Sequence, residues 1–272
     1  MFGISRQSIY QQIERSKKRS EELKKVKSLV LEKRMSMSRL GTRKLYYLLK
    51  EILNEQQIKI GRDGLFNLLR AENMLIKSEK NYTKTTHSKH WLRKYPNLLS
   101  NQKIERADQV YVSDITYIKS RERTHYLSLV TDAFSRKIVA YHLSDDMSSE
   151  NVVKALKMGL KNRKGKQSLI HHSDRGLQYC SSIYQKELQL NNITPSMTDG
   201  HDCYQNALAE RMNGIHKHEF LVYKCNTAKE LKVLIDQSIK TYNNERPHLS
   251  LNMKTPNLIH KKSSEDILTA FN

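Results

Sequence analysis

The chain has 272 residues, of which 48 are Lys or Arg and 28 are Asp or Glu, so its formal net charge is +20. Such an excess of positive charge attracts polyanions, and nucleic acid is therefore the expected partner. An acidic membrane surface is the weaker candidate, because the sequence shows neither a basic amphipathic helix beside an apolar anchor nor a spanning apolar run. Since no apolar signal core is present either, we expect a cytoplasmic, nucleoid-associated protein.

The three cysteines predict neither a disulfide framework nor a zinc ribbon. Their number is odd, they are widely spaced, and no two of them form a Cys-x-x-Cys pair: they are Cys180, Cys203 and Cys225. A zinc site built from Cys203 and histidines is disfavoured, because the spacings fit no established ligand pattern. The histidines in question are His171, His172, His201, His216 and His218. We expect ordinary reduced thiols.

The N-terminal region has the pattern of basic helices. Residues 4–10 look like the start of a recognition helix with Ser5 as its N-cap, but no helix precedes them as a helix-turn-helix requires. A charge-rich helix is expected over residues 14–34, followed by two helices around 40–49 and 65–69. Two interpretations stay open: a small DNA-binding unit, or a helical hairpin that packs on the main domain.

Changes in composition divide the chain into four parts. Residues 1–76 are the helical, basic region, and residues 77–108 form a basic linker with few apolar side chains. Residues 109–256 form the main domain, and residues 257–272 form a C-terminal tail. The linker is suited to following a phosphate backbone.

The main domain has an α/β pattern. β-branched and aromatic residues predict strands at 109–118, 126–131 and 137–142, and the short turns between them require an antiparallel meander. The elements expected next are a helix at 149–160, a strand at 168–172, a helix at 182–191, a strand at 193–197, a helix at 205–220, and a helix that opens at Thr227 and is closed by Pro247. The order βββαβαβα predicts a mixed sheet covered by helices, as in a ribonuclease H-like fold.

Three carboxylates stand where divalent-ion chemistry would need them. Phosphodiester chemistry commonly uses two divalent ions, and Mg²⁺ prefers carboxylate oxygens. Asp114 interrupts an apolar strand, where a charge is costly unless it is paired or metal-bound. Asp174 ends a strand, and ligand sites collect at the carboxyl ends of strands in open α/β sheets. Glu210 lies on a polar helix face, opposite an apolar stripe.

Each carboxylate also has an ordinary structural interpretation. Asp114 could form a salt bridge, and Asp174 could be a turn residue before Gly176. The polar face that carries Glu210 could be solvated surface. That face consists of Asn206, Glu210, Asn213 and Lys217, and the apolar stripe of Leu208, Met212 and Ile215. No single residue decides between these readings.

Four blocks together carry a resemblance to a known family. Residues 111–117 (YVSDITY), 172–179 (HSDRGLQY) and 206–214 (NALAERMNG) resemble the three catalytic blocks of the DDE integrase superfamily, with 35 residues between Asp174 and Glu210. Residues 242–248 (YNNERPH), followed by Thr255-Pro256, resemble its C-terminal signature. The resemblance is to the second-reading-frame transposases of two-frame bacterial insertion sequences, which are relatives of retroviral integrases.

The resemblance implies a chemistry and partners. Asp114, Asp174 and Glu210 would ligate two Mg²⁺ or Mn²⁺ ions while water or a DNA 3′-hydroxyl attacks a phosphodiester in line. Double-stranded DNA, as element ends and target, would be bound by a homo-oligomer, and a first-frame protein would supply a helix-turn-helix. Two positions depart from the family pattern: Gln205 stands where relatives usually have Asp, and Tyr111 where they often have Trp. Neither is a metal ligand in the family.

Four residues near the carboxylates are candidate DNA contacts. They are His172, Arg175, Arg211 and Lys217. His172 has a second interpretation, in which it orients a neighbouring group, and the three cations have the alternative of ordinary solvated charge. Two other functions also stay open: a DNA-binding repressor without catalysis, and a ribonuclease H-like nuclease that cuts without strand transfer.

Overall fold

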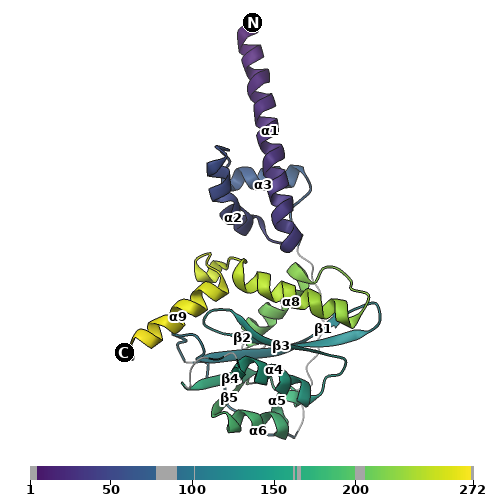
Figure 1. Ribbon diagram of the computed structural model, residues 1–272, viewed down its shortest axis with the longest axis vertical. Helices are drawn as coiled ribbons and strands as arrows, with labels where there is room; N and C mark the ends of the chain where they lie inside the picture. Colours follow the sequence, from purple (N-terminus) through teal and green to yellow (C-terminus); the bar gives the residue numbers. More distant parts are fainter. Residues whose placement is uncertain are drawn as a thin grey trace. The chain divides into compact units, whose positions relative to one another are not determined.

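The computed structural model describes residues 5–77, 91–100, 102–161, 163, 167–199 and 206–270, without the side chains of residues 264 and 266–270. The chain divides into two compact units, Met1–Glu79 and Lys80–Asn272. The first contains three helices and the second contains the sheet (Figure 1). Within the described residues, no helix combines the length and apolar character needed to cross a membrane.

The N-terminal unit consists of α1 (Arg6–Ser36), α2 (Thr42–Glu55) and α3 (Arg62–Ala71). The Ser5 side chain accepts a hydrogen bond from the backbone N–H of Ser8, which confirms it as the N-cap of α1. The expected helices at the N-terminus and over 14–34 are therefore one continuous helix. The buried apolar residues of this unit include Val26, Val30, Leu45, Leu49, Leu53, Leu65 and Leu69.

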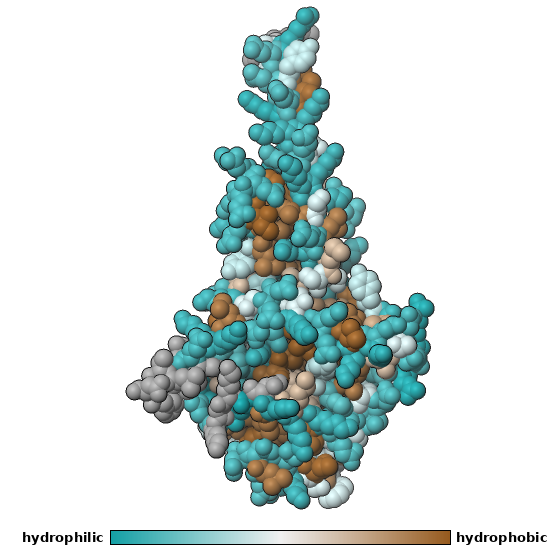
Figure 2. Space-filling model, in the orientation of Figure 1, coloured by the Kyte–Doolittle hydropathy of each residue, from teal (hydrophilic) through white to brown (hydrophobic). Residues whose placement is uncertain are grey.

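The N-terminal half of α1 has no such core. Residues 5–21 are exposed on every side of the helix. Figure 2 shows mainly hydrophilic residues over this half, with apolar ones between them. Ile9, Tyr10 and Ile13 are the large apolar side chains exposed there. Because a helix without packing is marginal in water, the stability of α1 comes from its C-terminal half.

The second unit is built on a five-stranded mixed sheet in the order β3-β2-β1-β4-β5. The strands are β1 (Val110–Lys119), β2 (Thr124–Asp132), β3 (Ile138–Ser144), β4 (Leu169–Ser173) and β5 (Ile193–Met197). β1, β2 and β3 pair antiparallel, whereas β4 pairs parallel to both β1 and β5. The predicted meander and the ribonuclease H-like mixed sheet are therefore confirmed.

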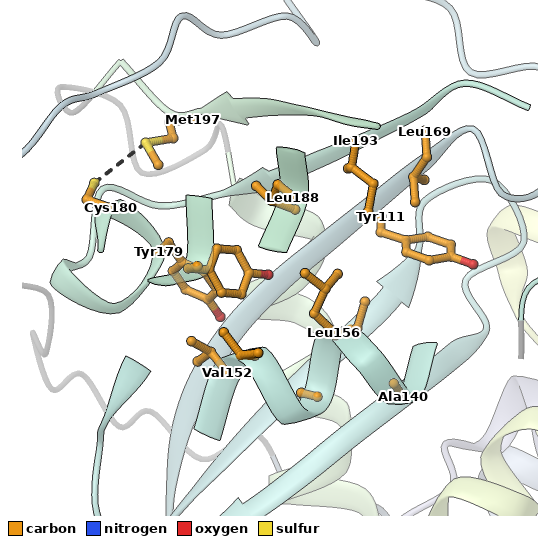
Figure 3. Packing of buried hydrophobic residues seen from close by; sticks show 14 residues of the cluster. Tyr111, Ala140, Val152, Leu156, Leu169, Tyr179, Cys180, Leu188, Ile193 and Met197 are labelled. Atoms are coloured by element: carbon orange, nitrogen blue, oxygen red, sulfur yellow. Dashed lines mark hydrogen bonds between the residues drawn. The ribbon is translucent and has the colours of Figure 1, made fainter. Parts of the chain in front are cut away.

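Helices cover both faces of the sheet. On one face, α4 (Ser149–Lys161), α5 (Leu177–Cys180) and α6 (Ser182–Leu190) enclose the larger core (Figure 3). Tyr111 of β1 is buried in that core and donates a hydrogen bond to Asp108, so Tyr is accommodated where relatives often carry Trp. On the other face, α7 (Ala207–Ile215) packs through Ala209 against Val110 and Val112. The alternation of side chains along β1 separates the two cores.

Three helical features differ from the sequence prediction. The short α5 was not expected. The helix predicted over 205–220 changes after Ile215 into a π-helical segment, η2 (His216–Phe220). Where only a tail was expected, α9 (Pro256–Ala270) follows α8 (Ala228–Asn244). Pro at the first position of α9 is a favourable helix start, a signal that a weak apolar periodicity obscured.

Asn243 of α8 completes the hydrogen bonding of β3, which is an edge strand of the sheet. Its Oδ1 accepts from the backbone N–H of Ile138 at 3.0 Å, and its Nδ2 donates to the carbonyl of Ile138 at 3.0 Å. Both residues are buried. The side-chain amide therefore satisfies the two backbone groups that a further strand would otherwise pair.

Replacing Asn243 by Ala should lower the free energy of unfolding by about 2–4 kcal/mol, because two buried backbone groups of Ile138 lose their partners. Urea unfolding followed by circular dichroism measures this change. Asn244→Ala, at the exposed neighbouring position, is the matched control and should change the same quantity by about 1 kcal/mol or less. Equal losses in the two variants would show that the Asn243 bridge contributes nothing specific.

Candidate active site

Asp114 lies in the middle of β1, the central strand of the sheet. It is half-buried, and both of its oxygens accept hydrogen bonds. Oδ1 accepts from the backbone N–H of Ile115 at 2.9 Å, and Oδ2 accepts from Nδ2 of Asn213 at 2.8 Å. These donors fix the orientation of the carboxylate and favour its ionised form.

Asp174 reaches the same level of the sheet because β4 runs parallel to β1. The register pairs Val112 with His172, and Asp174 follows directly after β4, two residues beyond His172, as Asp114 lies two residues beyond Val112 on β1. Oδ1 of Asp174 accepts from the backbone N–H of Gly176 at 3.1 Å. A Cβ atom at position 176 would lie 3.0 Å from that oxygen, so glycine permits the close turn.

Glu210 comes from α7, which packs across β1 and β2. The side chain of Glu210 is exposed, whereas Asn206 and Asn213 of the same helix are buried. Asn206 Nδ2 donates to the carbonyl of Ser113, and Asn213 donates to Asp114. The polar face of this helix is thus only partly a solvated surface: Glu210 and Lys217 are exposed, whereas the amides of Asn206 and Asn213 join the helix to β1.

Electrostatics show that the three carboxylates are brought together. Burial, together with the negative charges of Asp174 and Glu210, raises the pKa of Asp114 to about 7, although its two hydrogen bonds act in the opposite direction. Burial and the charge of Asp174 also raise the pKa of Glu210. Such mutual repulsion is typical of a site that binds cations or protons.

The three oxygens are spaced more widely than a compact single-ion cluster. Among the described residues, only one group of three His, Cys, Asp or Glu side chains has ligand atoms all within 4.8 Å of one another, and it lies elsewhere. That group is Asp108, Asp132 and His260. Asp132 there accepts from the backbone N–H groups of Asp108 and Ser135 and from the Ser135 hydroxyl, so its oxygens already serve a turn.

His172 was a candidate DNA contact, and the structure contradicts that role. Its side chain is 0% exposed, and Nδ1 lies 2.8 Å from the Ser196 hydroxyl on β5. A side chain with no exposed surface cannot contact DNA. The alternative interpretation, in which His172 orients neighbouring groups, fits this position, because Ser196 in turn accepts from the backbone N–H of Leu98.

The other predicted contacts differ in exposure. Arg175 is half-buried next to Asp174, whereas Arg211 and Lys217 are exposed on the helix that carries Glu210. All three remain predictions. His201, Cys203 and Gln205 lie outside the described residues.

The sequence did not predict the contacts of two residues that it had singled out, Asn213 and His171. Asn213 was assigned to a polar face without a partner, and His171 was considered only as a zinc ligand. His171 Nε2 lies 2.8 Å from both the Ser113 and the Tyr184 hydroxyl, directly behind Asp114 on β1. Burial lowers the pKa of His171 to about 3, so this imidazole is neutral and structural.

In the metal-free protein, Asp114→Asn should raise the free energy of unfolding at pH 8 by about 2 kcal/mol, since one pKa unit corresponds to about 1.4 kcal/mol and solvent screens part of the repulsion. The folded-state pKa of Asp114, about 7, exceeds the ordinary value of 3.8. The stability that protonated Asp114 gives the wild type is therefore fully present below about pH 4 and is lost as the pH rises through 7. The advantage of the variant should therefore vanish toward pH 4.

Urea unfolding in a chelator at pH 4.5, 6 and 8 tests this pH dependence. The substitution is sterically mild, because Asn213 can rotate its amide and accept from the new Asn side chain. The Oδ1 atom of Asn213 is available for this bond, because it is buried and makes no hydrogen bond to any residue that the structure describes. If Asp114→Asn raised the free energy of unfolding equally at all three pH values, the ionised Asp114 carboxylate would not be what destabilises the wild type.

Comparison with known proteins places this arrangement in a family. Residues 104–203 and 191–256 each match a family described as integrase core domain. The 31 kDa protein of insertion element IS600 from Shigella sonnei is 33% identical over 268 residues, which cover 96% of this chain and 97% of that protein. The InsF transposase of insertion sequence IS3A from Escherichia coli is 32% identical over 160 residues, 56% of each chain.

Among solved structures, the HTLV-2 integrase catalytic core domain in complex with magnesium aligns with a TM-score of 0.46 and 21% identity, over 57% of this chain and 97% of that one. Membership in the family rests on the sequence matches, above all on the relative that is similar over nearly the whole of both chains. This chain therefore belongs to the integrase-core family of DDE transposases encoded by bacterial insertion sequences.

Proposed function

We propose that this transposase cuts and joins DNA with two divalent metal ions, Mg²⁺ or Mn²⁺, held by Asp114, Asp174 and Glu210. The observation that carries the proposal is the convergence of these three carboxylates, whose burial and mutual repulsion raise the pKa of Asp114 to about 7. The donor set is all oxygen, which suits a hard divalent ion. Two divalent ions about 3.5–4 Å apart are the arrangement that this class of phosphodiester chemistry commonly uses.

The chain's own groups would prepare this site for the ions. Asn213 and the backbone N–H of Ile115 hold the Asp114 carboxylate, and the backbone N–H of Gly176 holds Asp174. Divalent ions bound there supply positive charge that activates the attacking hydroxyl and stabilises the leaving oxygen. Glu210 stays exposed on its helix, where substrate phosphate and ions can reach it.

Direct attack by water or a DNA 3′-hydroxyl is favoured over a covalent intermediate. Tyr179 carries a hydroxyl that is influenced by the charges of Asp114 and Asp174, and its side chain is buried. Burial raises the pKa of Tyr179 well above its ordinary value, and the charges of Tyr184, Asp114 and Asp174 act in the same direction. Its phenol therefore stays protonated and is a poor nucleophile.

The proposed substrate is double-stranded DNA, as element ends and target. The net charge of +20 supports it, as do Arg211 and Lys217, exposed on the helix of Glu210. A homo-oligomer on DNA and a first-frame protein that supplies a helix-turn-helix remain predictions. The domain boundaries at residues 76, 108 and 256 likewise remain proposals.

Ala substitution of Asp114, Asp174 or Glu210 should reduce both cleavage and joining about a hundredfold or more, as removal of one preorganised charge-stabilising group commonly does. Affinity for duplex DNA should stay close to that of the wild type, because these residues bind ions rather than phosphates. Glu150→Ala, an exposed carboxylate in the first turn of α4, is the control.

The assay offers a labelled element end together with an unlabelled target duplex, in Mg²⁺, Mn²⁺ or chelator. Joined product that requires the metal supports a transposase. Cleavage without joined product would support the nuclease alternative, and binding without either reaction would support a repressor. A variant that keeps joining near the wild-type rate would remove its residue from the proposed site.

Binding to non-specific duplex DNA should weaken steeply with salt. We expect a log–log slope of about −5 or steeper, because each neutralised phosphate contributes about −0.9. Fluorescence anisotropy between low and physiological salt measures it. A slope near zero would mean that the +20 charge serves a partner other than DNA.

A further inference from the structure

The helix that carries Glu210 has an unusual second half. α7 continues from Ile215 without a break into the π-helical segment η2 (His216–Phe220). The backbone N–H of Leu221 bonds to the carbonyl of His216 at 2.9 Å, the five-residue spacing of a π-turn. Such turns are rare and are frequent at functional sites. Because a π-turn rotates the side chains that follow it, η2 sets where Glu219 points.

Glu219, which is partly exposed, forms an ion pair with the buried Arg246. Both of its oxygens accept from the guanidinium, Oε2 from Nε and Oε1 from Nη2, each at 2.7 Å. The Arg246 side chain is 2% exposed. Its Nη1 atom lies 3.0 Å from Nε2 of His248, and its Cζ atom lies over the Tyr242 ring, 5.6 Å from the ring centre. Two parallel bonds fix both distance and direction, as a single contact does not.

Two side chains of α8 also contact the helix that carries Glu210. The Ser238 hydroxyl of α8 lies 3.4 Å from Nδ1 of the buried His216, and the Tyr242 hydroxyl lies 3.3 Å from the sulfur of Met212. On the opposite side, Asn213 bonds to Asp114 on β1. The helix is thus held between the sheet and the segment that begins with α8.

We propose that the Glu219–Arg246 pair positions Glu210, setting how closely its carboxylate approaches Asp114 and Asp174. The inference rests on the proposed function of Glu210 as a metal ligand. Since the Glu210 side chain is exposed, its place is set by its helix, and the ion pair locks the end of that helix. Metal ligands must be held within roughly 0.5 Å of their working geometry. Arg246 is a positioning residue, because its guanidinium bonds to Glu219 and His248 and would act on the metal ligands only through the helix.

Stability and positioning can be separated, because apolar side chains can replace a buried ion pair without loss of stability but cannot reproduce its directional bonds. Arg246→Met leaves the Glu219 carboxylate without its cation. The double variant Glu219→Met with Arg246→Met removes both charges. Lys157→Met with Glu187→Met removes a more exposed ion pair of 3.2 Å between α4 and α6, away from the helix of Glu210, and serves as the control.

Three quantities are measured for each protein: the melting temperature, the dissociation constant for Mn²⁺ by electron paramagnetic resonance, and the rate of strand transfer. Arg246→Met should lower the melting temperature by about 6 °C or more. The double variant should melt within about 3 °C of the wild type, yet bind Mn²⁺ about tenfold more weakly, as loss of a group that orients metal ligands typically does. The control should change neither Mn²⁺ affinity nor rate.

A double variant with wild-type stability and wild-type Mn²⁺ affinity would overturn the proposal and leave the pair a structural contact only. If the double variant does not fold, Arg246→Lys decides, because it keeps the charge but cannot form both parallel bonds. Weakened Mn²⁺ binding by folded Arg246→Lys supports positioning, and unchanged binding refutes it. Failure of the wild type itself to bind Mn²⁺ would instead refute the proposed function.

Discussion

Repulsion among three carboxylates is the constraint around which the second unit is arranged. Asp114 is half-buried and faces the charges of Asp174 and Glu210, which makes its ionised form unfavourable without a counter-charge. A chain that holds such a group must supply compensating contacts. Here the amide of Asn213 and the backbone N–H of Ile115 partly offset the penalty. The remaining imbalance is what a cation would relieve.

The layers around the site follow from the need to hold charges of like sign together. The parallel pairing of β1 and β4 brings Asp114 and Asp174 to one level, and the packing of α7 on β1 brings Glu210 from a third element. No short stretch of chain can do this, because adjacent residues on a strand point to opposite faces. A neutral, buried His171 between Ser113 and Tyr184 stiffens the sheet behind Asp114 without adding charge to the site.

The site and the bulk of the chain carry opposite charge, and each suits a different partner. An excess of 20 positive charges attracts a polyanion over long distances, whereas the small acidic site attracts divalent cations. A polyanionic substrate would be repelled by bare carboxylates at the reaction centre. Cations bound there would remove that conflict, which is the physical reason why the proposed function links DNA binding to metal binding.

The sequence by itself determined the features that depend on local pattern. Alternating β-branched residues and short turns were sufficient for the antiparallel meander, and the helical spacing of leucines was sufficient for α2 and α3. The positions of Asp114, Asp174 and Glu210 were predictable because their flanking blocks are distinctive. Their convergence followed from the expected fold, and the mutual shifts in pKa agree with it.

Only the tertiary structure decided which polar residues are buried and what they touch. His172 looked available for DNA, yet it bonds to Ser196 across 24 positions of sequence, and Asn213 bonds to Asp114 across 99. Glu219, within the π-helical segment His216–Phe220, bonds to Arg246, which lies 27 positions further along the chain. Helical periodicity carries no information about such partners, because a contact between distant segments is set by the packing of whole elements.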